Sequence, residues 1–192
     1  MKSLVDHLSQ YATYHRDPRN IATHFVGIPL IVVAVAILLS RPQWAGGWLS
    51  PAVLVALASA WFYLRLEVRL GVLMSVLLGL GIWAGQTLAE QSTPVWLASG
   101  VGMFVIGWAI QFVGHHYEGR KPAFVDDVTG LIVGPLFVVV ELAFLLGLRR
   151  ELKEQIEARA GGVRLRQKNA AVRTPSRASL ALTGFYVRHK TL

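Results

Sequence analysis

Long hydrophobic runs alternate with short polar connections along the chain. Each run is close to the roughly 20 residues that an α-helix needs to cross a bilayer, and charged residues are nearly absent from the runs. We therefore predict an all-α, polytopic membrane helix bundle with four membrane spans and a fifth, broken or re-entrant apolar segment. The five runs cover residues 21–40, 47–64, 70–89, 95–114 and 128–148.

The fifth run differs from the other four. Gly134-Pro135 interrupts it and Glu141 lies inside it, and both features are unusual for a helix that faces lipid. We expect the segment to break at Gly134-Pro135 and to return to the membrane face from which it entered.

Two helix starts are predicted near the N-terminus. Apolar residues at helical spacing within residues 2–14 are typical of a short amphipathic helix. Asp17 then offers an N-cap, and Pro18 suits the first position of a helix. A helix that starts there carries Asn20 and His24 on one face, because four residues make about one turn.

The composition strengthens the membrane interpretation. Of the 192 residues, 54% are hydrophobic and 16% are charged, and the mean hydropathy is +0.48. In a typical soluble domain, roughly a quarter of the residues are charged. The sequence contains no cysteine, which excludes disulfides, thiolate-bound zinc and iron–sulfur clusters. Any metal must therefore take nitrogen and oxygen ligands.

The net charge of +8 is concentrated at one end of the chain. From Arg149 onward there are eleven Lys and Arg against three Glu, whereas residues 1–148 carry eight basic and eight acidic side chains. We predict a membrane-embedded catalytic domain over residues 1–150 and a basic, cytoplasmic, partly disordered tail over residues 151–192. Such a tail is better suited to anionic membrane lipid than to nucleic acid. The sequence indicates no oligomeric state.

The basic residues in the connections also predict an orientation. Cytoplasmic loops of membrane proteins carry an excess of Lys and Arg, so we expect an integral membrane protein with a cytoplasmic N-terminus, in the inner (plasma) membrane if the source is bacterial. His24 and His115 then lie at the same membrane face. That face collects Lys2, Arg16, Arg19, Arg65, Arg69, Arg120 and Lys121, and the opposite face has Arg41.

Histidines gather beside two of the hydrophobic runs. His15 and His24 lie at the start of the first run, and His115 and His116 follow the fourth. Neutral imidazole is the commonest protein ligand for divalent transition metals, and three or four imidazoles suit iron, zinc, copper or nickel. Because both groups are predicted at one membrane face, we interpret them as a single metal site on the cytoplasmic side.

Polar residues around the second group suggest further roles. Arg120 and Lys121 would hold a carboxylate head group, or they only mark the topology. Glu118 is three residues from His115 and shares its helical face. Asp126 would accept a hydrogen bond from the N–H group of a metal-binding imidazole and so orient the ring, without binding the metal itself, or it caps the next helix.

Two motifs surround these histidines. They comprise Tyr14-His15 through Asn20 with His24-Phe25-Val26-Gly27-Ile28-Pro29, and Trp108 with Gln111-Phe112-Val113-Gly114-His115 and Glu118 through Pro122-Ala123. Taken together, the motifs resemble the 2-hydroxy fatty acid dioxygenase family, which consists of small membrane proteins, and the resemblance covers residues 7–150.

The resemblance implies iron(II)-dependent α-oxidation. A long-chain 2-hydroxy fatty acid and O₂ would react to give the fatty acid that is one carbon shorter and CO₂. This conversion removes four electrons from the substrate, which the reduction of one O₂ consumes, so no NADH, flavin or 2-oxoglutarate is needed. The lack of a Gly-rich nucleotide-binding signature in the sequence agrees with this reaction.

The resemblance also assigns residues. The family's essential histidines match His15, His24 and His115. The segment from the second histidine group to Glu118 is one residue shorter here than in the family, so we place Glu118 outside the ligand set and keep His116 as a further candidate metal ligand. The candidates for substrate binding are Asn20, Arg120 and Lys121.

Three other classes of protein remain compatible with the residues. A purely structural membrane protein is one of them, but it leaves the two histidine groups unexplained. A membrane transporter or proton-relay protein would use the same histidines to carry ions or protons, but it would carry ionisable residues at mid-depth in several helices, and Glu141 is the one candidate. A haem protein would need facing histidine pairs on helices.

Overall fold

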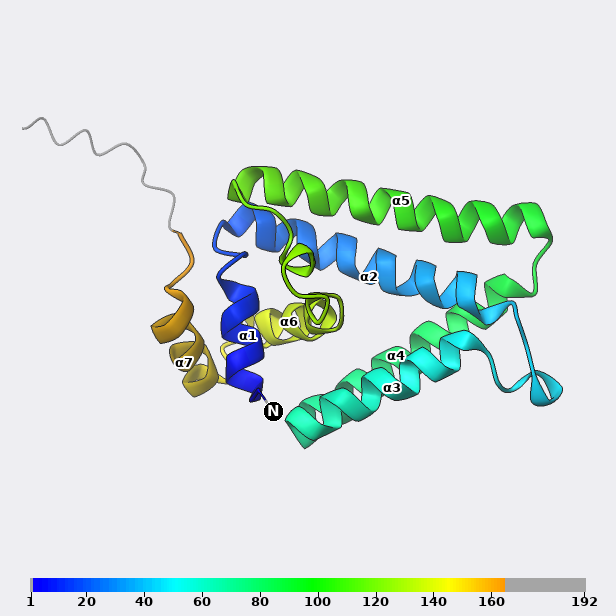
Figure 1. The fold of residues 1–192 in the computed structure, drawn as a ribbon, viewed down its shortest axis with the longest axis horizontal. Helices are drawn as coiled ribbons and strands as arrows, with labels where there is room; N and C mark the ends of the chain where they lie inside the picture. The colour runs from blue at the N-terminus through cyan, green and yellow to red at the C-terminus, as the bar shows by residue number, and fades with distance from the viewer. Residues whose placement is uncertain (1, 165–192) are drawn as a thin grey trace, which may run out of the picture.

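The computed structural model describes residues 2–164, and these residues form a helical protein without strands (Figure 1). The all-α prediction is confirmed for this part of the chain. Most of the predicted basic tail, residues 165–192, lies outside the described residues. The α-helices are α1 (Leu4–Ala12), α2 (Pro18–Ser40), α3 (Pro51–Leu66), α4 (Val68–Ala89), α5 (Thr93–Glu118), α6 (Gly130–Leu145) and α7 (Arg150–Ala160), with 3₁₀ turns η1 (Ala45–Gly47) and η2 (Ala123–Val125).

Three helices are long and apolar enough to cross a membrane, namely α2, α4 and α5. A fourth candidate is the pair α6 and α7, which is bent by 118°. The predicted run at residues 47–64 forms the shorter helix α3, of 16 residues. It starts at Pro51 because the preceding residues form a tight connection, in which the Trp44 and Leu49 backbones pair. The structure therefore supports three spans where the sequence predicted four.

The helix starts at the N-terminus follow the predicted signals. Ser3 caps α1 through a capping box with Asp6, and the Asp17 side chain accepts the Arg19 N–H at the start of α2. Such caps satisfy backbone N–H groups that have no partner within the helix. The two caps fix the short connection between α1 and α2.

Helix α2 is the centre of the bundle and packs against α3, α4, α5 and α6. Glycines allow α4 and α5 to approach it closely. A Cβ at Gly85 of α4 would lie 2.8 Å from the Ala36 backbone, and one at Gly107 of α5 would lie 2.7 Å from the Ile31 side chain. Figure 1 shows α2 and α5 side by side along their lengths, with α3 and α4 diverging from them at one end.

Helix α6 contradicts the predicted break at Gly134-Pro135. It continues through Pro135 to Leu145, although proline beyond the first turn removes one backbone hydrogen bond. Gly134 instead admits the Tyr11 hydroxyl, which would lie 3.0 Å from a Cβ at that position. The glycine therefore serves packing against α1.

The turn of the fifth run lies after α6 instead. Gly147 adopts φ +73°, its N–H bonds to the Phe144 carbonyl, and the Leu148 N–H bonds to the Ala143 carbonyl. This Schellman arrangement ends α6 with a glycine in the left-handed conformation. The chain then turns sharply into α7, which packs on α1 and buries Ile156 and Ala160. The first part of the predicted tail is thus an ordered helix.

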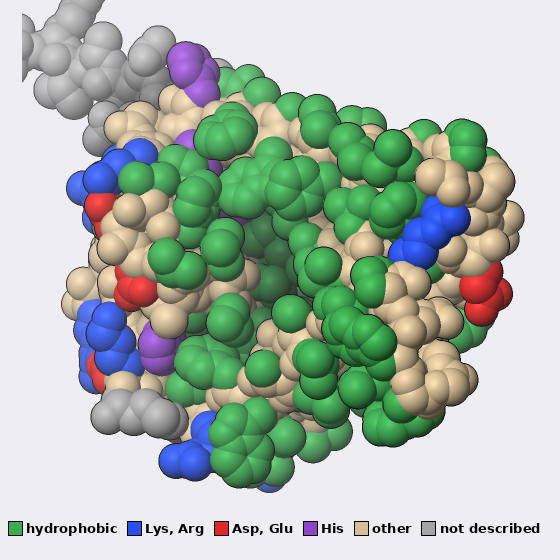
Figure 2. Space-filling model, turned by 45° about the vertical axis from the view of Figure 1, so that its right-hand side comes forward, with side chains coloured by type: hydrophobic (Ala, Val, Ile, Leu, Met, Phe, Trp, Pro, Cys, Tyr) green, Lys and Arg blue, Asp and Glu red, His purple; other side chains and the backbone are tan. Residues whose placement is uncertain are grey.

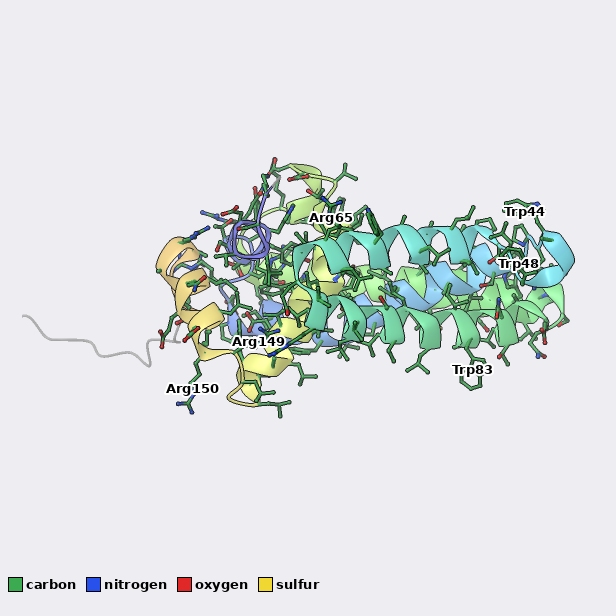
Figure 3. The ribbon with its side chains drawn as sticks, turned by 90° about the horizontal axis from the view of Figure 1, so that it is seen from below. Trp44, Trp48, Arg65, Trp83, Arg149 and Arg150 are labelled. Carbon is green, nitrogen blue, oxygen red and sulfur yellow. The ribbon has the colours of Figure 1, made fainter. Side chains whose placement is uncertain are left out.

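Hydrophobic side chains dominate the outside of the long helices. Figure 2 shows them covering the middle of one face, which is hollowed near its centre, with charged side chains toward the edges. Figure 3 shows Trp44, Trp48 and Trp83 near one end of the helices and Arg65, Arg149 and Arg150 near the other. Tryptophan at one interface and basic residues at the other are typical of a membrane-embedded bundle.

Candidate metal centre

Three histidines from separate parts of the chain meet at one end of the bundle. His15 lies in the connection between α1 and α2, His24 in α2, and His115 in the last turn of α5. Each offers a ring nitrogen within 4.8 Å of the others, and all three side chains are at least 94% buried. The predicted convergence of the two histidine groups is therefore found in the structure.

Backbone carbonyls fix the tautomers of two of the rings. His15 Nδ1 lies 2.8 Å from the Tyr11 carbonyl, and His24 Nδ1 lies 2.8 Å from the Asn20 carbonyl. A carbonyl only accepts hydrogen bonds, so each Nδ1 carries the proton and donates it. Each neutral ring then presents an unprotonated Nε2. Both carbonyls lie four residues before their histidine, within α2 for His24 and across the turn after α1 for His15.

The two Nε2 atoms face each other at 2.8 Å. Two lone pairs at this distance repel each other unless a proton or a cation lies with them. Burial, followed by the neighbouring His24 ring, lowers the pKa of His15 well below its ordinary value, which disfavours a proton. The two nitrogens could therefore bind a cation together.

The donor set fits a transition metal. Imidazole nitrogens bind such metals at about 2.1 Å, which separates adjacent ligands of an octahedral ion by roughly 3 Å. The 2.8 Å between His15 and His24 is close to this separation. His115 Nδ1 is buried and has no hydrogen-bond partner within residues 2–164. Three nitrogen ligands without thiolate suit iron, zinc, copper or nickel.

A buried carboxylate holds the His15 connection in place. Glu118, 3% exposed, accepts hydrogen bonds at Oε2 from the Arg16 N–H (2.9 Å), the Asp17 N–H (2.7 Å) and the Asn20 amide (3.2 Å). These contacts link the end of α5 to the start of α2. Glu118 therefore positions the loop that carries His15, and it is not itself in the three-histidine group.

Asn20 lies behind the site. It is fully buried, its amide also donates to the Tyr14 carbonyl, and its own carbonyl accepts from His24. A Cβ at Gly114 would lie 2.5 Å from Asn20 Oδ1, so this glycine lets α5 approach α2 at the histidines. Asn20 was expected to bind substrate, and the structure gives it contacts with the protein.

His116 is exposed, about 100° around α5 from His115, and it does not join the three-histidine group. Arg120 is exposed and donates to the Thr13 carbonyl at 3.0 Å, and Lys121 pairs with Asp126 at 2.5 Å. These side chains lie at the rim of the site.

Asp126 connects the rim to the His15 loop. Its Oδ2 accepts a 2.8 Å hydrogen bond from the Tyr14 hydroxyl, next to His15 in the sequence. The hydrogen bonds from Lys121 and Tyr14 lower the pKa of Asp126. No hydrogen bond from Asp126 to an imidazole is found among the described residues, so its effect on the site passes through Tyr14.

A cavity of about 70 Å³ opens beside the histidines, and His24 and His115 line it. Two residues in its wall were not among the predicted site residues. Tyr11 stacks on His15 with ring centroids 4.1 Å apart, and burial raises the pKa of its hydroxyl. Gln111 is 4% exposed, and its Nε2 has no partner among residues 2–164. A retrospective signal for Gln111 is its place one turn before His115.

A second cavity, of about 380 Å³, reaches His15 from the side of α7. Arg16, Glu141, Lys153 and Glu157 contribute charged groups to its wall. Glu141, the acidic residue inside the fifth run, therefore faces a cavity that also contains other charged groups. Both cavities at the site are mostly apolar, and the larger one has four charged side chains in its wall.

Comparisons with known proteins agree with the motifs. A family model described as 2-hydroxy-palmitic acid dioxygenase Mpo1-like matches residues 1–146. The 2-hydroxy-palmitic acid dioxygenase MPO1 of Saccharomyces cerevisiae is 34% identical over 161 residues, which cover 81% of this chain and 90% of that protein. No solved structure gives a significant match. The resemblance inferred from the two motifs is confirmed.

Proposed function

The chain belongs to the Mpo1-like family of 2-hydroxy-palmitic acid dioxygenases, and we propose that it is a membrane-bound, non-haem iron(II) dioxygenase. Its reaction would be the α-oxidation of a long-chain 2-hydroxy fatty acid. The observation that carries the proposal is the buried group of His15, His24 and His115, in a relative of a named dioxygenase.

The reaction balances without a further co-reactant. A 2-hydroxy acid and O₂ give the acid one carbon shorter, CO₂ and water. The bond between the carboxyl carbon and the 2-carbon breaks, the 2-carbon becomes the new carboxyl carbon, and the four electrons released reduce O₂. Iron(II), when bound, would supply the means to bind and reduce O₂ next to the substrate.

The residues of this chain have separate roles in the proposal. His15, His24 and His115 hold the iron. Glu118 is a positioning residue, because it fixes the backbone on both sides of Arg16 and so the place of His15. Tyr11 holds the His15 ring by stacking. Removal of a residue that holds a metal ligand in place typically lowers metal affinity or activity 10–100-fold.

The polar groups around the histidines would orient the substrate. Gln111 and Tyr11 line the cavity next to His24, so the Gln111 amide can donate to an oxygen of the bound 2-hydroxy acid. Arg120 and Lys121, at the rim, would attract the substrate carboxylate on its way in. The apolar body gives the long alkyl chain a hydrocarbon environment.

Oxygen uptake tests the reaction. Purified protein reconstituted with iron(II) under anaerobic conditions should consume one O₂ per 2-hydroxy acid and release one CO₂ and the acid that is one carbon shorter. The same acid without the 2-hydroxyl group is the matched control and should cause no uptake. No consumption of O₂ with any 2-hydroxy fatty acid would refute the proposal.

We also propose that the N-terminus and the histidines face the cytoplasm, on the basis of the basic residues at that end. The chain has no cysteine, so single cysteines can be introduced and labelled from one side of a sealed vesicle. A cysteine at Lys2 should label from the cytoplasmic side and one at Trp48 from the opposite side. The reverse pattern would contradict this orientation.

A further inference from the structure

A groove without charged residues lies next to the histidine cavity. It has a volume of about 320 Å³, and helices α2, α4 and α6 form its walls. All thirteen residues in its wall are apolar or glycine. Buried polar groups would be costly in such a place, so its chemistry suits a hydrocarbon chain.

The groove is adjacent to the cavity at the metal centre. Ile28 and Val32 of α2 and Pro135 of α6 line both the groove and the cavity at His24 and His115. Only these three side chains are shared by the two walls, so a small movement of them would join the two spaces. A molecule with its polar end at the histidines and a long apolar end would extend past them into the groove.

We propose that this groove holds the acyl chain of the substrate and that Gly81 of α4 sets the chain length which fits. The proposal rests on the function proposed above and adds where the chain lies. Along α4 the groove extends from Met74 to Ala84, which is roughly 15 Å at 1.5 Å per helical residue. An extended chain advances roughly 1.2 Å per bond, so about a dozen methylenes fit, which is the range of a long-chain acid.

Gly81 lies where the groove closes. One turn later, a Cβ at Gly85 would be 2.8 Å from the Ala36 backbone of α2, so α4 and α2 converge directly after Gly81. Residues four apart share a helical face, and Gly81 therefore also faces α2. A Cβ at Gly81 would meet no atom of the described chain within 4 Å. A larger side chain there would occupy the groove without displacing the protein.

The second cavity is the competing place for the chain. It is slightly larger, reaches His15 and is mostly apolar, but Arg16, Glu141, Lys153 and Glu157 contribute charged groups to its wall. An alkyl chain there would cover charged groups and reduce their contact with water, which is costly. The groove between α2, α4 and α6 has no such cost.

Gly79 provides a matched control for Gly81. It lies on the same helix, is exposed, and would also place a Cβ where residues 2–164 leave open space. It does not line the groove. Gly79→Leu and Gly81→Leu make the same chemical change and raise helix propensity equally. A difference in activity between the two variants is therefore due to the position of Gly81 in the groove.

The first experiment compares chain-length profiles. Wild type, Gly79→Leu and Gly81→Leu are assayed for O₂ uptake with saturated 2-hydroxy acids of increasing length. Gly81→Leu should lose about tenfold or more in kcat/KM on the longest acids and keep its activity on shorter ones, while Gly79→Leu follows wild type. A Gly81→Leu profile equal to that of wild type would overturn the assignment. Inactivity of wild type on every acid would instead refute the proposed function.

The second experiment needs neither iron nor turnover. A 2-hydroxy fatty acid with a diazirine at its last carbon is photolysed with the wild-type protein, and the labelled peptide is identified by mass spectrometry. Labelling on α4 near Gly81 supports the assignment of the groove to the acyl chain. This labelling should decrease when unlabelled 2-hydroxy acid is added, and it should also decrease in the Gly81→Leu variant. Labelling near Phe25 or Phe144 in the second cavity would overturn the assignment. So would labelling that excess 2-hydroxy acid does not reduce, which is expected if membrane lipid fills the groove.

Discussion

The two ends of helices α2 and α5 differ in how their residues are held. At the histidine end, α1, η2, α6 and α7 cover the helix ends, and buried polar side chains such as Asn20 and Glu118 hydrogen-bond to each other and to the backbone (Figure 1). At the opposite end, the connection between α2 and α3 is short and exposed, with Trp48 68% accessible. Its backbone includes Ala45 and Gly46 at positive φ.

This difference indicates that the histidine end carries the chemistry and that the opposite end anchors the protein in the membrane. Buried polar groups are costly unless they are hydrogen-bonded, so the network around His15 and Glu118 indicates a function beyond packing. Exposed tryptophan at the other end is typical of a membrane interface. We therefore expect substitutions at the histidine end to affect metal binding and turnover, and those at the other end to leave both intact.

The largest effect is expected for His24→Ala, with His116→Ala as its control. His24 is buried within the three-histidine group, whereas His116 is exposed and outside that group. His24→Ala should reduce kcat with a 2-hydroxy fatty acid by more than the roughly 100-fold upper range for residues outside the ligand set. The His116→Ala variant should retain most of the wild-type kcat. Equal losses in the two variants would contradict the assignment of ligands.

A smaller loss is expected for Glu118→Ala. This change leaves the N–H groups of Arg16 and Asp17 without their acceptor, which costs about 1–3 kcal/mol of stability for each buried group, and it releases the His15 loop. We expect iron(II) affinity to fall 10–100-fold, measured by competition with a chelator. Glu118→Gln keeps one carbonyl oxygen and should recover part of the affinity. Wild-type affinity in Glu118→Ala would remove Glu118 from the positioning role.

The smallest effect is expected at the rim. Arg120→Ala removes a cation that would attract the substrate carboxylate, and since Arg120 is exposed its contribution is screened by salt. KM should rise by about two- to fivefold at low salt with kcat unchanged, and the difference should shrink at high salt. Trp48→Ala, at the opposite end, should leave KM unchanged at both salt concentrations. A large fall in kcat for Arg120→Ala would point to a role in turnover.

Much of this arrangement follows from local sequence signals. The Asp17-Pro18 pair fixes the start of α2 and so the depth of His24, and the basic connections predict that His115 lies at the same end. Local patterns do not specify how His15 is held. Its position depends on Glu118, about one hundred residues away in the sequence, and on the stacked ring of Tyr11.

The fifth hydrophobic run shows why a strong local signal can mislead. Gly134-Pro135 predicts a break, yet the helix continues, and Gly134 makes room for Tyr11 of α1. The chain turns instead at Gly147, where a single glycine closes the Schellman arrangement. The signal at Gly147 is local, since glycine commonly follows the last turn of a helix, whereas the role of Gly134 in packing against α1 depends on a residue more than one hundred positions away.

Iron(II) binding by the purified protein tests the central claim most directly. Anaerobic titration of wild type and of the His15→Ala, His24→Ala and His115→Ala variants measures the ions bound per chain. We predict one iron(II) per chain in wild type and strongly weakened binding in each of the three variants. Absence of binding in wild type, or binding that persists unchanged in all three variants, would contradict the assignment of these histidines as the metal centre.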